Sequence, residues 1–546
     1  MSHLSRACAL ATTLLALAAP AAPSLVIVNA QVFTADPARP RAEAVAVEGA
    51  RIAAVGRSAD IRALAGPGTR IVDAGGRRLV PGLVEAHVHL GQELPAAPLA
   101  LPGLPFPGPS AEQALAAVEA AARQGEGWIG AYVGPALARD GRNWRAALDL
   151  VAPDRPVLLR GFWGHTTLVN SAGLQRLGIA DDVADPLGGW WGRDAQGRLD
   201  GRAFEAAETL VPQARPMSPD ELASAYAEAA GRYARWGVTS IHLMNSEHSL
   251  PLVLQALARA GTPQKWTIYA WATPAARVAQ AWERLEALGP LPPRVRVEGP
   301  KWVLDGTPLE QNAHQRADYH GRPGWTGRSN FGTAELRELL GQALRSPHQM
   351  ALHVVGDAET DRLLALMREL APPAAWRAKR VRIEHGDGVR EDSVAAARAL
   401  GLTVIQNPTH LPPPPEPGRP PLIDRPMLLR GLMAAGLPLA LGSDGGVDEQ
   451  NPYVNLLLAT TYAGRPAEAL SRAQALRAYT AGGAYAERQE ARKGRIAPGL
   501  AADLALLSQD VLTVPAERLP ATTSLLTLVD GVVVFEDPAL AGSGPQ

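Results

Sequence analysis

Two histidines, His87 and His89, lie two residues apart in the apolar run Val80–Leu90. Successive side chains of a β-strand point to opposite faces, so both imidazoles leave the same face of one strand. The remaining residues of the run are mostly apolar, which is typical of a strand covered on both faces in a parallel sheet. Buried imidazoles need a partner, and a transition metal such as zinc is the usual partner of a pair. A lone His-x-His pair is a weak signal, so the following strands decide its meaning.

Seven further apolar, strand-like runs follow and alternate with helical stretches. The eight runs are 80–90, 237–244, 266–271, 295–305, 350–355, 381–385, 402–406 and 437–444. Most of them recur at intervals of about 30 residues, which matches a repeated βα unit, and eight such units form a TIM barrel. The sequence therefore predicts an α/β fold built on a TIM (β/α)8 barrel.

The connection between the first and second strands is far longer than one βα unit. Loops that follow barrel strands emerge at the C-terminal, active-site face. We therefore predict barrel strand 1 at 80–91, a lid or substrate-binding insertion at 92–216, and the remainder of the barrel at 217–490. Ser218 is predicted to cap a helix at Glu221–Arg235.

Both ends of the chain contain short strand-like runs. They are Leu25–Phe33, Ala44–Val47, Arg51–Val55, Asp503–Leu507 and Leu525–Phe535, the last with an Asp530-Gly531 hairpin signal. Neither end has enough apolar surface to fold alone. We expect one small β-sandwich-like domain built from 23–79 and 491–546, with two separate β-tails as the alternative.

The first residues resemble an export signal. Arg6 precedes an apolar run, Ala7–Ala19, that is too short to span a bilayer. Residues 1–22 are therefore predicted as a signal peptide of a soluble periplasmic or secreted protein; an Ala-rich tail on a cytosolic enzyme is the alternative. Cys8, the only cysteine, falls within this segment. A mature chain without a thiol excludes disulfides, cysteine nucleophiles and cysteine metal ligands.

The charge of the chain is nearly balanced. Its 546 residues carry 53 Lys and Arg against 54 Asp and Glu. No basic stripe of the kind that nucleic acid requires is present. No other apolar stretch is long enough for a transmembrane helix. We expect a small-molecule substrate, neither a nucleic-acid partner nor an integral membrane segment, and a homodimer as the candidate assembly.

Four more side chains of metal-binding chemistry lie at or near the ends of predicted strands: Lys301, His353, His385 and Asp444. Taken singly, such a histidine is more often a hydrogen-bonded core residue, such a lysine faces solvent, and Gly-Ser-Asp-Gly is a turn. Together with His87 and His89 they gather at one end of one barrel. This common location favours a metal centre.

These residues lie in motifs that resemble the amidohydrolase superfamily, and within it the amidohydrolase 3 group of YtcJ-like and N-substituted formamide deformylase-like proteins. The resemblance extends from about Val26 to near the end of the chain. Its motifs are Pro81-Gly-Leu-Val-Glu-Ala-His-Val-His89, Gly164-His165 with Asn170-Ser171, Lys301 with Asp305-Gly306, His353-x-x-Gly-Asp357, Glu384-His385, Gly442-Ser-Asp444, Ala475-Leu-Arg-Ala-Tyr-Thr480 and Pro498-Gly-Leu-Ala-Ala-Asp503.

The resemblance implies a role for each predicted site residue. His87 and His89 would hold one metal with Asp444, and His353 and His385 would hold a second. A carbamate formed from carbon dioxide on Lys301 would bridge two zinc ions, with manganese or iron as alternatives. Asp444 would also act as general base towards a metal-activated water. His165 would steady the developing oxyanion or, alternatively, serve as a structural cap within the insertion.

The motifs do not name a substrate. Trp163, Trp302 and Asp305 are predicted to contact it. The leading hypothesis is a metal-dependent hydrolase that cleaves a non-peptide carbon–nitrogen bond in an amide, formamide or cyclic amide. One alternative is hydrolysis of an ester, lactone or phosphoester by the same centre. The other is an exported metal-binding or ligand-binding protein without turnover.

Overall fold

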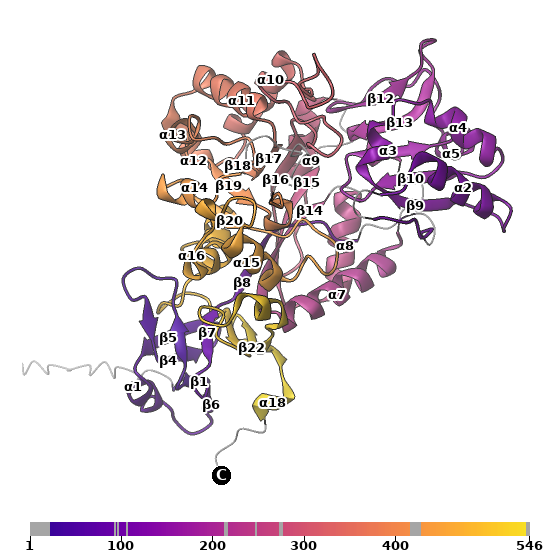
Figure 1. The fold of residues 1–546 in the computed structure, drawn as a ribbon. Helices are drawn as coiled ribbons and strands as arrows, with labels where there is room; N and C mark the ends of the chain where they lie inside the picture. The colour runs from indigo at the N-terminus through magenta and orange to yellow at the C-terminus, as the bar shows by residue number, and fades with distance from the viewer. Residues whose placement is uncertain are drawn as a thin grey trace, which may run out of the picture.

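Eight parallel strands form the centre of the molecule, in the order β8, β14, β15, β16, β17, β18, β19, β20. They are β8 Leu83–Val88, β14 Val238–Asn245, β15 Lys265–Trp271, β16 Val295–Val303, β17 Ala351–Val354, β18 Arg382–His385, β19 Thr403–Gln406 and β20 Leu439–Leu441. The backbone N–H of Asp444 donates to the carbonyl of His87 at 3.0 Å, so the first and last strands meet. The predicted barrel is confirmed (Figure 1).

The computed structural model describes residues 22–91, 94, 98–104, 108–211, 217–245, 248–271, 277–414 and 427–541. The predicted signal peptide, Cys8 included, lies outside this range except for residue 22. Within the described segments, no helix combines the length and the apolar character that a membrane crossing requires.

Helices surround the barrel strands. They are α7 Pro219–Arg235, α8 Leu250–Ala260, α9 Val278–Glu286, α10 Thr333–Arg345, α11 Asp357–Leu370, α12 Pro373–Lys379, α13 Val394–Ala399, α14 Arg430–Ala434, α15 Pro452–Thr461, α16 Arg472–Arg477, the π-helix η4 Ala478–Gly482 and α17 Gly483–Ala486. At the start of α7, the backbone N–H of Glu221 donates to Ser218 Oγ at 3.2 Å, and that of Ser218 to Glu221 Oε2 at 2.7 Å. This capping box confirms the predicted helix start. Short 3-10 turns, η2 Pro408–His410 and η3 Pro466–Glu468, complete the barrel.

The long connection after β8 folds around its own five-stranded sheet, ordered β12, β13, β11, β10, β9. Its strands are β9 Ile129–Val133, β10 Val157–Gly161, β11 Thr166–Val169, β12 Gly189–Arg193 and β13 Leu199–Glu205. Its helices are α2 Ala111–Ala122, α3 Pro135–Arg139, α4 Trp144–Val151, α5 Ser171–Leu177 and α6 Ala206–Leu210. Figure 1 shows this insertion at the right, beside the barrel. Its buried apolar clusters are separate from the barrel core, so it has packing of its own.

Strands from both ends of the chain share one sheet. A six-stranded sheet has the order β23, β22, β21, β7, β2, β3, and a four-stranded sheet has the order β5, β4, β1, β6. Leu504 of β21 pairs antiparallel with Pro81 of β7. Apolar residues of the two sheets pack into a common core. The predicted β-sandwich-like domain from both termini is therefore confirmed.

The elements of this domain are β1 Leu25–Val28, β2 Gln31–Phe33, β3 Arg41–Ala42, β4 Ala44–Glu48, β5 Arg51–Gly56, α1 Ser58–Arg62, β6 Arg70–Asp73, β7 Arg78–Pro81, β21 Leu504–Leu507, the 3-10 helix η5 Ala516–Ala521, β22 Ser524–Val529, β23 Val532–Glu536 and α18 Pro538–Ala541.

Two predicted strands are each divided between two sheets. The run Val80–Leu90 begins in β7 of the small domain, and only β8 belongs to the barrel. The run Leu25–Phe33 is β1 followed by β2, separated at Asn29, whose φ is 54°. The run 80–90 is buried on both sides of its break, and in the run 25–33 only Asn29 and Gln31 are exposed. Hydrophobicity alone could therefore not show where the chain changes sheets.

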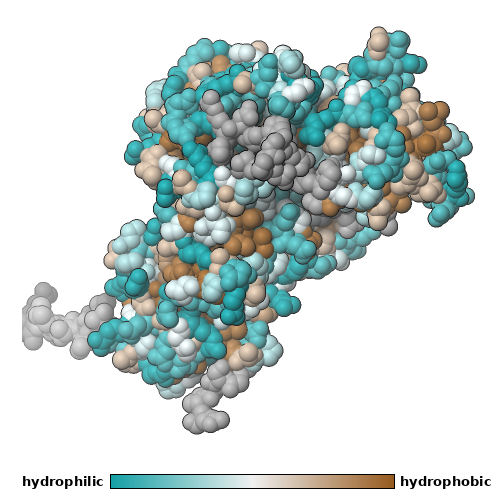
Figure 2. Space-filling model, viewed as in Figure 1, coloured by the Kyte–Doolittle hydropathy of each residue, from teal (hydrophilic) through white to brown (hydrophobic). Residues whose placement is uncertain are grey.

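The surface drawn in Figure 2 is mostly hydrophilic, with apolar areas that are small and separate. The large apolar side chains that are exposed on the described part of the chain come from distant segments: Leu64, Ile71, Leu150, Leu291, Val447 and Val532. Such scattered residues are normal on a monomer surface. The homodimer therefore stays a prediction.

Candidate metal centre

All six predicted metal-binding side chains lie together at the C-terminal ends of the barrel strands. The ring centroids of His87 and His385 are 4.9 Å apart, and those of His353 and His385 are 4.5 Å apart. His89 lies 5.5 Å from His87 by the same measure. Lys301 Nζ is 3.3 Å from His87 Nε2. Segments that are hundreds of residues apart in the chain therefore converge on one centre.

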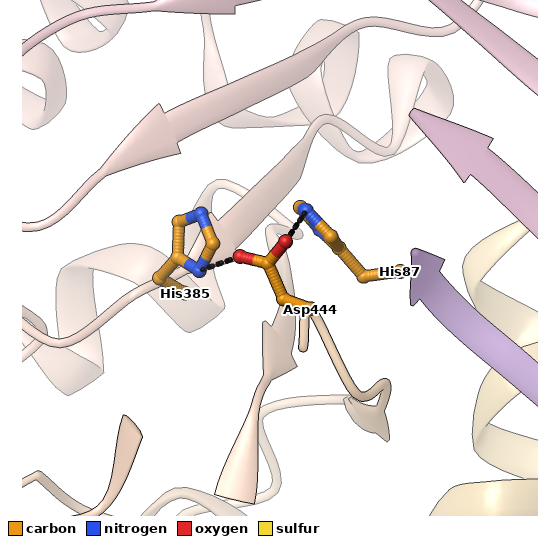
Figure 3. Close-up of side chains that lie close together, drawn as sticks. All are labelled: His87, His385 and Asp444. Carbon is orange, nitrogen blue, oxygen red and sulfur yellow. Dashed lines mark ion pairs between the residues drawn. The ribbon is translucent and has the colours of Figure 1, made fainter. Parts of the chain in front are cut away.

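Asp444 lies in the middle of this group. Its Oδ1 is 3.5 Å from His87 Nε2, and its Oδ2 is 3.7 Å from His385 Nδ1 (Figure 3). Oδ1 is also 3.5 Å from His89 Nε2. These separations are longer than hydrogen bonds. Two ligands at about 2.1 Å from a tetrahedral zinc ion lie roughly 3.4 Å apart. The Nε2 atoms of His87 and His89 are therefore spaced from Asp444 Oδ1 as ligands of a common cation would be.

Hydrogen-bond partners leave one lone pair free on each of three imidazoles. His87 Nδ1 lies 2.7 Å from Glu384 Oε2, and His385 Nδ1 lies 2.9 Å from Asn407 Oδ1. These acceptors assign a hydrogen to Nδ1 and leave Nε2 as the electron-pair donor. His353 is reversed, since its Nε2 lies 3.4 Å from the carbonyl of Gly306 and its Nδ1 is left for a metal.

Burial sets the charge of these groups. It lowers the pKa of His87, His89, His353 and His385 well below the usual value, and neighbouring cationic groups lower it further, so the imidazoles are neutral. Burial also lowers the pKa of Lys301 to about 8. It raises the pKa of Asp444 to about 7, although Lys301 opposes this change. Neutral imidazoles and a lysine that readily loses its proton are the forms that can bind a cation or react with carbon dioxide.

The backbone leaves the extended conformation where two of these side chains attach. φ is 69° at His385 and 46° at Asp444, values that L-residues rarely adopt. Side chains of a strand otherwise alternate between faces, yet Glu384 and His385 are consecutive and both contact His87. Such strain is concentrated at functional sites.

The insertion contributes His165 to this centre. Its ring centroid lies 4.8 Å from that of His353, and its Nδ1 lies 2.8 Å from Glu205 Oε2. Trp163 Nε1 donates to Glu310 Oε2 at 2.8 Å. Donor atoms of His165, Glu205 and Glu310 all lie within 4.8 Å of one another. His165 therefore joins the insertion to the barrel mouth beside the predicted metal ligands.

Trp302 lies beside Lys301. It is buried and lines a small cavity, together with Leu187, Gly188, Ala206, Trp271, Lys301, Val303 and Phe331. The Lys301 Nζ is 5.7 Å from the ring centroid of Trp271. The structure thus brings Trp302 close to the centre, whereas Trp163 faces Glu310.

Asp305 has a different environment from the other predicted site residues. It is fully buried, and its carboxylate accepts backbone N–H bonds from Val355 at 3.0 Å, Gly356 at 2.7 Å and His314 at 3.0 Å. These bonds join the loop between β16 and α10, which we call the strap (residues 304–332), to the end of β17. A structural role accounts for this carboxylate, and its contact with substrate stays a prediction.

The sequence prediction omitted residues that support or adjoin the centre: Glu384, Asn407, His410, Glu205 and Glu310. His410 Nε2 lies 3.6 Å from Asp444 Oδ2, and its ring stacks on His385 at 5.2 Å. His410 could have been found from the sequence, because it follows the seventh barrel strand as other predicted ligands lie at the ends of their strands. Glu205 and Glu310 come from the insertion and the strap, where no barrel repeat points to them.

The family model described as "Amidohydrolase family" matches residues 70–535 of the chain. The chain belongs to the amidohydrolase family. This amidohydrolase is 26% identical over 527 residues to YtcJ of Bacillus subtilis (strain 168), covering 91% of this chain and 96% of that one. It is also 26% identical over 568 residues to N-substituted formamide deformylase of Arthrobacter pascens, covering 94% and 98%. The resemblance found in the sequence is confirmed.

A solved structure shares the fold. The crystal structure of an uncharacterized metal-dependent hydrolase from Pyrococcus furiosus superposes with a TM-score of 0.63 at 21% identity, covering 90% of this chain and all of that one. Family membership makes the chain a hydrolase and implies a divalent metal. The neutral imidazoles, the carboxylate and their spacing fit such an ion.

Proposed function

We propose that this amidohydrolase cleaves a non-peptide carbon–nitrogen bond, in an amide, formamide or cyclic amide, with the aid of a pair of divalent metal ions. The observation that carries the proposal is the position of Asp444, whose carboxylate lies within 3.7 Å of three predicted histidine ligands. The likeness to a protein named N-substituted formamide deformylase supports the bond class.

The residues present divide into two ligand sets. His87, His89 and Asp444 would hold one ion, and His353 and His385 would hold the other. Zinc suits neutral imidazoles, and manganese and iron remain alternatives. Lys301 would bridge the sets after its neutral Nζ attacks carbon dioxide, forming a carbamate N–C bond and releasing one proton. When bound, such ions supply an ionised water near neutral pH and polarise a carbonyl.

The chain's own groups would move the protons and orient the substrate. Asp444, with its pKa raised by burial to about 7, suits a base that accepts a proton from water and passes it to the leaving nitrogen. His165 beside His353 would stabilise the negative charge on the carbonyl oxygen. Trp302, Trp163 and Asp305 remain the predicted substrate contacts.

Export to the periplasm or medium would follow from cleavage of the segment at 1–22 and remains part of this proposal. Sequencing the N-terminus of protein recovered from the culture medium and the periplasm tests it. A cytosolic protein that keeps residue 1 would contradict export without affecting the proposed chemistry.

Two substrate panels test the bond class. Protein loaded with zinc or manganese is assayed against amides and formamides and, separately, against esters, lactones and phosphoesters. Turnover of the first panel is expected, and turnover of the second panel alone would refute the carbon–nitrogen assignment.

Asp444→Asn tests the mechanism. Loss of a general base lowers kcat by about 10²–10⁴-fold. The matched control is Asp448→Asn, an exposed residue of the same loop, which should keep wild-type kcat. Unchanged turnover in Asp444→Asn would show the mechanism to be wrong.

A further inference from the structure

Glu205 is a buried carboxylate that the proposed mechanism does not use, and it is bound to His165 twice. The side-chain hydrogen bond joins His165 Nδ1 to Glu205 Oε2 at 2.8 Å, and the backbone N–H of Glu205 donates to the carbonyl of His165 at 3.1 Å. Only 1% of the Glu205 surface is exposed. An acid buried this deeply is costly unless it has a specific partner.

The fold explains why these two residues meet. β11 and β13 are antiparallel, and Thr166 pairs with Phe204, so His165 and Glu205 are the next pair at the end of that ladder. Both have left-handed backbones, with φ of 64° at His165 and 54° at Glu205. A pair of strained residues at one sheet end, beside His353, is the arrangement expected where geometry serves a reaction.

A second carboxylate fixes the neighbouring turn. Glu310 of the strap accepts from Trp163 Nε1 at 2.8 Å and from the backbone N–H of Thr307 at 2.5 Å. Trp163 is two residues before His165, so the turn that carries the imidazole is held from the barrel side as well. Ring orientation is thus determined by the insertion and the barrel together.

We propose that Glu205 is a positioning residue that holds the His165 ring by its Nδ1 edge and thereby keeps an Nε2–H donor directed at the substrate oxygen. This role rests on the proposed function of His165. Burial raises the pKa of Glu205 well above its usual value, so its carboxyl keeps a proton and donates it to Nδ1. The single hydrogen of the neutral ring then lies on Nε2. Loss of Glu205 frees the ring to rotate or to place its hydrogen on Nδ1 alone, which removes the donor.

A double-mutant cycle on the metal-loaded full chain tests this role, with the amide hydrolysed best as substrate. Glu205→Gln should lower kcat on the order of ten- to a hundredfold with little change in KM and no loss of bound metal. His165→Ala should lower kcat by at least the same factor. In the His165→Ala background, Glu205→Gln should have no further effect, because both changes remove one function. Independent, additive losses would overturn the proposal.

Glu359→Gln is the matched control. Glu359 is also buried, and its Oε2 lies 3.0 Å from His314 Nδ1, so the same kind of histidine–carboxylate pair is broken away from the metal residues. The control should keep wild-type kcat even if its thermal stability falls. A loss of kcat equal to that of Glu205→Gln would assign the effect to general destabilisation and contradict the proposal.

Crystal structures of the metal-loaded wild type and Glu205→Gln supply a readout that needs no substrate. Displacement of the His165 ring in the variant is expected, and an unchanged ring would overturn the positioning role. If neither substrate panel is hydrolysed, the proposed function fails, and these structures still decide whether Glu205 orients the ring. Should Glu205→Gln not fold, Glu205→Asp, which keeps the carboxyl group but shortens its reach, replaces it in both experiments.

Discussion

Lys301 is ordinarily a cation, yet it lies among side chains that are predicted to bind metal cations. An ammonium there would repel a metal, and burial already opposes it by lowering the pKa of Lys301 to about 8. A substantial neutral fraction near physiological pH is what reaction with carbon dioxide requires. The position of Nζ, 3.3 Å from His87 Nε2, puts the resulting carboxylate among the imidazoles.

Lys301→Ala should therefore lower bound metal from two equivalents per chain towards one, as measured by elemental analysis after dialysis. Wild-type protein supplied with ¹³C-bicarbonate should show a carbamate signal by ¹³C NMR that the variant lacks.

Lys379→Ala is the control for that experiment. Burial also lowers the pKa of Lys379 to about 8, but its Nζ bonds to backbone carbonyls, one of them that of His348 at 3.1 Å. The control should keep both metal equivalents and the signal. Two equivalents in Lys301→Ala would exclude a bridging role.

At the scale of the element, β20 approaches β8 so closely that only glycine fits between them. A Cβ added at Gly442 would lie 2.4 Å from the backbone N of His87 and 2.9 Å from Glu85 Oε1. Glu85 Oε1 in turn accepts the backbone N–H bonds of Ser443 at 2.8 Å and His87 at 3.1 Å. The contact that nearly closes the barrel thus also positions Asp444 against the first histidine.

Gly442→Ala should destabilise the protein by about 1–3 kcal/mol through overpacking, and it should weaken metal binding because Asp444 moves. Thermal unfolding and metal titration of the purified variant measure the two effects.

Gly446→Ala is the comparison variant from the same loop, since a Cβ there would meet only Glu449 Oε2, at 3.7 Å. It should leave both quantities close to wild type. Wild-type metal affinity in Gly442→Ala would contradict the coupling of barrel closure to the site.

The barrel strands could be predicted because each is a short apolar run. The six predicted metal ligands could be found because they are titratable groups in or near five of these runs. The role of Glu384 could not be predicted, because successive side chains of a strand point to opposite faces and Glu384 precedes His385 directly. The positive φ at His385 is what turns both side chains towards the centre of the barrel. The role of Glu205 could not be predicted either, because its contact with His165 depends on how two strands of the insertion pair. Hydrophobic pattern does not encode that register.

At the scale of the whole molecule, the segment that leads from the barrel to the β-sandwich-like domain carries a buried ion pair. Glu487 Oε1 lies 2.6 Å from Lys493 Nζ and 3.2 Å from His242 Nε2, and its Oε2 accepts from Thr267 Oγ1 at 2.6 Å. Burial alone would raise the pKa of Glu487, but Lys493 and His242 hold it well below its usual value. The pair fastens this segment to β14 and β15 inside the barrel.

Glu487→Gln leaves Lys493 buried without its counter-charge, which should cost about 3–5 kcal/mol of unfolding free energy at neutral pH. Because the folded-state pKa of Glu487 is depressed, its contribution is present above the unfolded value of 4.5 and is lost as pH falls through the folded value. The difference in unfolding free energy between wild type and Glu487→Gln should therefore shrink as the pH falls below 4.5 towards the folded-state pKa. Urea unfolding followed by circular dichroism at neutral and acid pH measures it.

Glu369→Gln serves as the surface comparison, because Glu369 pairs with Arg337 at 2.7 Å in an exposed setting. Exposed pairs contribute little, so this variant should follow wild type at every pH. A Glu487→Gln effect independent of pH would disprove the assigned ionisation.

The long insertion enters and leaves the barrel at one place. Gly91, just after β8, has its carbonyl 2.7 Å from His248 Nε2, and a Cβ on it would lie 2.5 Å from Leu222 of α7, the helix that resumes the barrel. The insertion also contacts the barrel through Trp163, which donates to Glu310, and through His165, which lies beside His353. Chimaeras that exchange residues 92–216 for the matching block of another family member should therefore acquire the donor's substrate preference only where that block keeps counterparts of Trp163, His165 and Glu205, so that selectivity and reactivity are inherited together.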